Sequence, residues 1–315
     1  MAGLMVFMAV LLWRHHLAAA PIPVHFLEGS LHGFLELRTP RDVVIASGDL
    51  LQVVREGEVK SRLVFHFKDE SVFEETVLFS QRDVFTMQSY HRVQRGPAFP
   101  EDTVVSLERA SGKYHVMTKS HENGREKMLD GVIELPLDVY NGMIPVVLKN
   151  LSGGVRETIR MVVFAPAPKL VELELVPAGE DKLLVGGTER SATHYILKPV
   201  LGIWMKFFAS LLGRMPPDNH VWIVAAEVPA FVKFEGQLYL NGPVWRIELT
   251  SPRWPDIGGL IPSITVSHIY DSGSRADRKP HARTIQSGVK NHCQDRRNLT
   301  LKLQVHSEQP KGEQK

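Results

Sequence analysis

Cysteine is almost absent from this sequence, and its scarcity excludes several kinds of site. The 315 residues contain one cysteine, Cys293, which lies close to the C-terminal end. No disulfide can form within the chain, and the rest of the sequence can supply neither a cysteine-ligated zinc site nor a cysteine nucleophile. A chain without disulfides can still be exported when its core is large enough.

Motifs that build common catalytic and cofactor sites are also missing. The chain has no Gly-x-Ser-x-Gly elbow, no phosphate-binding loop and no dinucleotide fingerprint. We therefore expect no cofactor, and we favour a protein that is not an enzyme.

An excess of charge of one sign is confined to the end of the chain. The formal net charge is only +2, and residues 271–315 carry ten Lys or Arg against five Asp or Glu. The first 270 residues therefore have a net charge of −3. We expect residues 256–315 to be a basic, disordered tail. No aromatic residue follows Tyr270, so we expect no nucleic-acid partner.

The N-terminal residues 1–20 have the pattern of a signal peptide. An apolar run from Gly3 to Trp13 precedes the small residues Leu17–Ala20. The run is too short to cross a bilayer, which needs about 20 apolar residues. No Lys or Arg precedes it, and Arg14 follows it, so an uncleaved apolar arm is the alternative. The signal-peptide interpretation predicts export to the periplasm or cell envelope.

Residues 21–255 are dominated by the two-residue alternation of β-strands. The clearest examples are Val171–Leu175 and Trp245–Thr250, and a third places Phe85, Met87 and His91 on one face. One apolar and one polar face are typical of antiparallel sheets. Many such strands separated by turns predict a mainly β fold, an antiparallel meander that forms a curved sheet or an incomplete or closed barrel.

Glycine-containing pairs mark the turns between these strands. Asn123-Gly124 predicts a type I′ hairpin, because both residues readily adopt positive φ. Gly186-Gly187 lies between two strands and is interpreted as a bulge or bend.

Two segments predict short helices. Asn141–Leu151 has Asn141 as a possible N-cap and a proline in the first turn. Pro199–Arg214 has an apolar stripe at helical spacing. That stripe can pack on the barrel as core, or it can act as a lid over an apolar cavity or touch lipid. The residues that we expect to bind a ligand are the four on this stripe and one on the following strand: Trp204, Phe207, Phe208, Leu211 and Trp222.

Polar side chains offer only weak catalytic or metal-binding candidates. His194, His220 and Asp218 could converge on a metal or act in hydrolysis, but their spacing matches no known motif. Glu74 and Glu75 are neighbours on a strand, so they point to opposite faces and cannot act together on one bond.

Several short motifs resemble those of a family of uncharacterised bacterial exported proteins found in soil bacteria. The resemblance covers roughly Phe26 to Pro255, and its motifs are Gln94–Pro100, Glu134–Asp138, Asn141–Met143, Pro217–Val224, Pro229–Val232 and Gly242–Trp245. It implies a β-rich exported protein and no catalytic residues. The predicted meander with a short helix is also similar to envelope lipid carriers of the lipoprotein-carrier type, which use an incomplete barrel with an apolar cavity.

Three functions are compatible with these features. The leading hypothesis is an exported, non-catalytic protein that holds a lipid or acyl chain in a β cavity, with possible peripheral contact to a membrane. The second is a structural or assembly module of the cell envelope with a filled core and a partner at the sheet edge. The third is a metal-dependent or His/Asp hydrolase.

Overall fold

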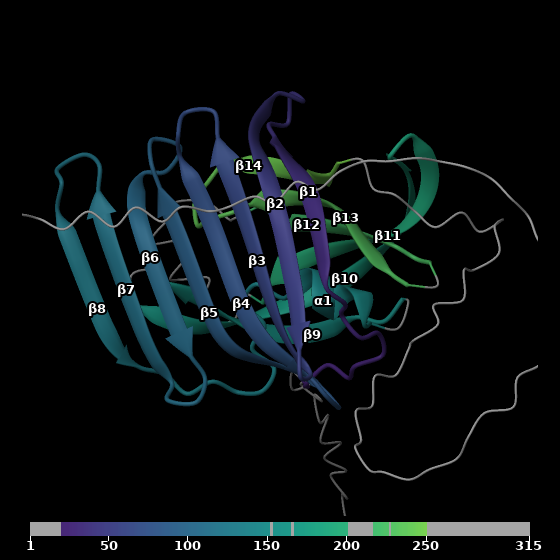
Figure 1. The fold of residues 1–315 in the computed structure, drawn as a ribbon, viewed down its shortest axis with the longest axis horizontal. Helices are drawn as coiled ribbons and strands as arrows, with labels where there is room; N and C mark the ends of the chain where they lie inside the picture. Colours follow the sequence, from purple (N-terminus) through teal and green to yellow (C-terminus); the bar gives the residue numbers. More distant parts are fainter. Residues whose placement is uncertain (1–19, 152–153, 165–166, 201–216, 227, 251–315) are drawn as a thin grey trace, which may run out of the picture. The chain divides into compact units, whose positions relative to one another are not determined.

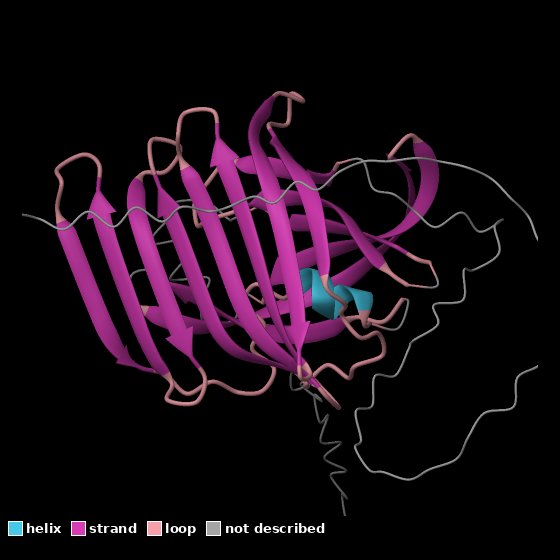
Figure 2. Ribbon diagram, viewed as in Figure 1, coloured by secondary structure: helices cyan, strands magenta, loops and turns pink. Residues whose placement is uncertain are grey.

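The computed structural model describes residues 20–151, 154–164, 167–200, 217–226 and 228–250. All of them belong to one compact unit, Met1–Asp256. The described residues form fourteen strands and one helix, α1 (Ile144–Lys149) (Figures 1 and 2). The strands are β1 (Leu31–Arg38), β2 (Val44–Arg55), β3 (Glu58–Phe67), β4 (Val72–Gln81), β5 (Phe85–Arg95), β6 (Glu101–Glu108), β7 (Lys113–Ser120), β8 (Glu126–Val132), β9 (Glu157–Phe164), β10 (Pro168–Val185), β11 (Thr188–Pro199), β12 (Asn219–Val224), β13 (Ala230–Gln237) and β14 (Val244–Leu249).

The fourteen strands form a single antiparallel sheet. Its order is β8-β7-β6-β5-β4-β3-β2-β1-β14-β13-β12-β11-β10-β9, so nearly every strand pairs with its neighbour in sequence. The exception is β1, which pairs with β14 at Leu35↔Leu249 and Leu37↔Ile247. Within the described residues β8 and β9 are the free ends, and the sheet is therefore not closed. The predicted mainly β meander is confirmed, in its open form.

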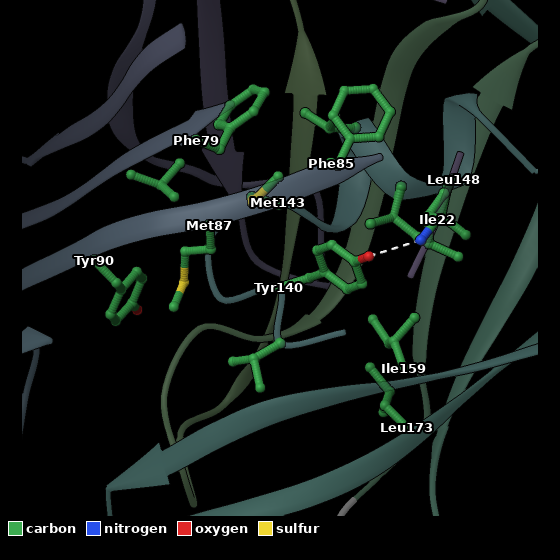
Figure 3. Packing of buried hydrophobic residues seen from close by; sticks show 14 of the residues in the cluster. Ile22, Phe79, Phe85, Met87, Tyr90, Tyr140, Met143, Leu148, Ile159 and Leu173 are labelled. Carbon is green, nitrogen blue, oxygen red and sulfur yellow. Dashed lines mark hydrogen bonds between the residues drawn. The ribbon is translucent and has the colours of Figure 1, made fainter. Parts of the chain in front are cut away.

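The two halves of the sheet share one apolar interior. Phe79, Phe85 and Met87 from β4 and β5 belong to the same buried cluster as Ile159 from β9 and Leu173 from β10 (Figure 3). Helix α1 lies between these halves and contributes three buried residues to that cluster (Figure 1). We call the sheet surface that carries these side chains the inner face. Its burial drives the curvature, because removing apolar area from water is the main favourable term in folding.

A polar residue at the end of α1 joins the helix to the start of the described chain. The Asn150 Oδ1 atom accepts hydrogen bonds from the backbone N–H groups of His25, at 2.8 Å, and Phe26, at 2.7 Å. Its Nδ2 atom donates to the carbonyl oxygen of Val146 at 2.9 Å. Nearby, the backbone N–H of Ile22 donates to the buried Tyr140 hydroxyl at 2.7 Å (Figure 3).

The expected helix is present, but Asn141 does not cap it. The N-cap residue is Met143, which makes no side-chain cap hydrogen bond, while a proline occupies the first turn as expected. The Asn141 amide instead binds the backbone N–H and C=O of Val162 on β9, both at 2.8 Å. Bonding to the edge strand satisfies both ends of the amide at once, which an N-cap would not do.

Two hairpins depart from the predicted turn types. Gly186 and Gly187 have φ of 58° and 80° and connect the paired residues Val185 and Thr188, so they form a two-residue type I′ turn rather than a bulge. The hairpin at Asn123-Gly124 is present between β7 and β8. Only Gly124 has positive φ there, at 66°, and five residues separate the strands, so the predicted type I′ turn is wrong.

Candidate functional site

Four side chains form a line across the inner face of β2–β5. Leu50, Leu63, Glu75 and Arg92 lie directly opposite one another in the strand register. All four keep part of their surface accessible, in contrast to most of the inner face. We call this set the inner row. It presents two aliphatic and two ionisable side chains next to each other.

The inner row lies where two buried clusters meet. On β4, Glu75 is flanked on its own face by Phe73, which belongs to one cluster, and by Val77, which belongs to the other. Phe231 and Phe234 on β13 pack against both clusters. The junction therefore combines partly accessible apolar surface with a carboxyl and a guanidinium group.

The polar part of the row is tied to a buried tyrosine. The Tyr90 hydroxyl donates a hydrogen bond to Glu75 Oε1 at 2.7 Å. Desolvation by burial raises the pKa of Glu75, although this hydrogen bond and the nearby Arg92 act in the opposite direction. Burial and the Glu75 charge raise the pKa of Tyr90 well above its usual range. The surroundings therefore favour the neutral forms of both groups.

A β-bulge decides which residues of β5 face inward. The register between β4 and β5 shifts at Leu78/Phe79, so the inward set changes from Phe85 and Met87 to Tyr90 and Arg92. The extra residue of a bulge reverses the alternation beyond it. The prediction that His91 shares a face with Phe85 and Met87 is therefore wrong. His91 instead lies on the outer face, where it helps to lower the pKa of Glu74. Glu74 also forms an ion pair with Arg62 on that face.

Glu74 and Glu75 point to opposite faces, as predicted. On the outer face, Arg62 Nε donates to Glu74 Oε1 at 2.8 Å, and Arg62 Nη2 donates to Glu74 Oε2 at 2.9 Å. This ion pair lowers the pKa of Glu74, while burial raises that of Glu75. The two neighbours thus have different electrostatic roles.

A second polar group lies on the outer face of β11–β13. His194 and His220 approach with Nε2 and Nδ1 2.9 Å apart. The ring of His194 stacks on Trp222, with centroids 4.5 Å apart and planes 8° apart. The indole Nε1 of Trp222 donates to Asp181 Oδ2 at 2.7 Å, and Lys233 Nζ lies 4.2 Å from the ring centroid.

The structure brings together two of the three metal or hydrolase candidates. Desolvation lowers the pKa of His194, with a further contribution from His220, so the neutral imidazole is favoured. Asp218 is exposed, and among the described residues no hydrogen bond or ion pair joins it to either histidine. Asp181 instead lies 3.5 Å from His194 Nδ1. No group of three or more His, Cys, Asp or Glu side chains suited to a metal occurs in the described ranges.

The aromatic ligand-binding candidates fall mainly outside the described residues. Trp204, Phe207, Phe208 and Leu211 lie within the range 201–216, so their role stays a prediction. Trp222 is described and 7% exposed, but it belongs to a small cluster on the outer face. It therefore does not share the inner row.

Sequence reasoning missed the inner row. One signal was available, because Glu75 interrupts the apolar alternation of Phe73, Val77 and Phe79 on β4. A carboxyl at a core-facing position is seldom found without a partner or a function.

Comparisons with known proteins assign no activity to this chain. No protein-family model and no curated protein matches the chain. One solved structure is similar, the crystal structure of a beta-barrel-like protein of domain of unknown function DUF1849 from Brucella abortus. Its TM-score is 0.38 at 10% identity, and the match covers 74% of this chain and 98% of that one. In the described part of this chain, no helix has the length and apolar character needed to span a bilayer.

Proposed function

We propose that this is an exported, non-catalytic protein that binds an apolar ligand, such as a lipid or acyl chain, on the inner face of its curved sheet. The observation that carries the proposal is the partial accessibility of Leu50 and Leu63 on a face that is mostly buried. Each methylene that a ligand removes from water there contributes about 0.8 kcal/mol. The apolar N-terminal run supports export.

The strand β2 offers a matched pair of variants to test this function. Leu50 faces inward, whereas its neighbour Leu51 is 44% exposed on the outer face. Leu50→Gln should weaken the binding of hexadecanol or an apolar fluorescent dye, because it places an amide against the ligand. Leu51→Gln should leave binding unchanged.

Native mass spectrometry and lipid extraction of the purified full chain provide the direct measurement. Co-purification or uptake of lipid, detergent or hexadecanol is the expected result. A protein that is empty after purification and takes up none of these would remove the proposed function.

The free edge strand β8 favours a second candidate function, assembly with another copy of the chain. Met128 and Val132 on β8 are 67% and 70% exposed at the end of the sheet. Unpaired edge strands readily pair with other strands. Light scattering should then show a dimer that Val132→Lys disrupts; a monomeric wild type would exclude this function.

A further inference from the structure

Arg92 is a cation on the inner face that lacks a full set of partners. It lies on β5 directly opposite Glu75 on one side and the fully buried Val105 on the other. Its Nε atom is buried and forms no hydrogen bond within the described part of the chain. No carboxylate among the described residues forms an ion pair with it. An uncompensated charge in such a position costs free energy unless a partner is supplied.

Three arginines on the outer face differ from Arg92 because they form ion pairs with carboxylates. On the outer face, Arg62 pairs with Glu74, and Arg38 and Arg246 both pair with Glu248. Arg38, Arg62 and Arg246 thus each have a carboxylate partner, which Arg92 lacks among the described residues. Within the described residues, Arg92 has a hydrogen bond to Tyr90 and lies near the Glu75 carboxyl group, whose pKa is raised by burial.

A second unpartnered group lies on the same face of β5. Gln94 is 4% exposed, and its Oε1 atom is buried without a hydrogen-bond partner in the described ranges. It follows Arg92 by two residues on one side of the bulge, so both side chains point inward. Buried polar atoms in folded proteins are normally satisfied. The polar end of the inner row therefore leaves one donor, Arg92 Nε, and one acceptor, Gln94 Oε1, without hydrogen bonds in the described ranges, and only the donor can bind an anionic group.

We propose that Arg92 binds the carboxylate head of a long-chain fatty acid whose acyl chain lies along Leu63 and Leu50. The inference rests on the proposed function and names its ligand class. A guanidinium group forms two parallel hydrogen bonds to a carboxylate, which adds geometric specificity to the charge attraction. The single negative charge of a carboxylate matches the single positive charge of Arg92.

The test compares ligands that share a chain and differ in the head group. Binding of hexadecanoate, hexadecanol and a lysophosphatidate with a hexadecanoyl chain to the full-length protein is measured by calorimetry. The variants are Arg92→Met, Arg92→Lys and the control Arg62→Met, the same change on the outer face of the sheet. Thermal unfolding of each variant establishes that it is folded.

The expected result is a preference for hexadecanoate that depends on Arg92. A hydrogen-bonded charge pair corresponds to roughly ten- to one-hundredfold in affinity. Arg92→Met should therefore weaken hexadecanoate binding by about that factor and leave hexadecanol binding unchanged. Arg92→Lys should keep the preference for the carboxylate, and Arg62→Met should bind like the wild type. If Arg92→Met fails to fold, Arg92→Lys and the ligand comparison in the wild type still decide the matter.

Other outcomes overturn the inference separately from the proposed function. Equal affinity of the wild type for hexadecanoate and hexadecanol would reject the carboxylate site while the apolar ligand site remains. Tightest binding of the lysophosphatidate, lost in Arg92→Met, would assign a phosphate head group instead. Failure of every ligand to bind would reject the proposed function itself.

Discussion

Replacing Asn150 with alanine tests how the interior of the sheet is closed by α1. The substitution removes both bonds from Asn150 Oδ1 to the backbone of His25 and Phe26, and the bond from its Nδ2 to Val146. Asn150 is 1% exposed, so water cannot replace its side chain without entering the site. Each bond contributes about 1 kcal/mol net, and an unsatisfied buried partner costs about 1–3 kcal/mol. Because His25 and Phe26 are exposed, their N–H groups regain water, and we expect a total loss of about 2–4 kcal/mol.

Equilibrium unfolding in urea, followed by tryptophan fluorescence and circular dichroism, measures this loss. At this chain length the same loss lowers the melting temperature by roughly 4–16 °C. Asn123→Ala is the matched control, because Asn123 Oδ1 accepts one bond, from the backbone N–H of Arg125 at 3.0 Å, in an exposed turn. The amides of His25 and Phe26 should also exchange faster with solvent in Asn150→Ala. Equal destabilisation by the two substitutions would refute the role assigned to Asn150.

Three further substitutions test the electrostatics and packing, each by urea unfolding. Burial raises the Glu75 pKa in the folded protein, so stability falls as pH rises above the unfolded-state value of about 4.5. Glu75→Gln cannot ionise and should therefore gain in stability on the wild type as pH rises above that value, and parallel profiles would contradict this. Desolvation lowers the His194 pKa in the folded protein, so stability is lost as pH falls through about 6.5. His194→Gln should reduce that loss, and an equal loss in the wild type and the variant would contradict this. Gly48→Ala would place its methyl group against the Phe65 ring and should cost about 1–3 kcal/mol. Gly33→Ala is the control and should cost less, because its methyl group would make only an ordinary van der Waals contact with Leu249 Cδ1 at 3.6 Å; similar costs would disprove the packing argument.

Local patterns in the sequence were sufficient to predict the type of sheet. The alternation in Val171–Leu175 and Trp245–Leu249 reflects one buried and one solvated face, and both segments are strands with that pattern. Turn residues separate consecutive strands, which indicates a meander because short connections favour antiparallel neighbours. These features depend only on residues close together in the chain.

The candidate site depends on features that local patterns do not contain. A bulge opposite Leu78/Phe79 turns Tyr90 and Arg92 inward and His91 outward. The sequence of β5 contains no residue pattern that predicts this bulge. The alignment of Leu50 with Arg92 across four strands follows from the register of three successive hairpins. An error of one residue in any hairpin would move a side chain to the other face.

The pairing of β1 with β14 has a consequence for how the sheet is assembled. All the other ladders join strands that follow each other in sequence, whereas this one joins Leu35 to Leu249. The two meanders β1–β8 and β9–β14 can therefore form from local contacts. The β1–β14 ladder then joins residues that are distant in the chain. Closing so long a loop carries an entropic cost before any contact across it is gained. Pairing of β1 with β14 should therefore be the slowest step of folding.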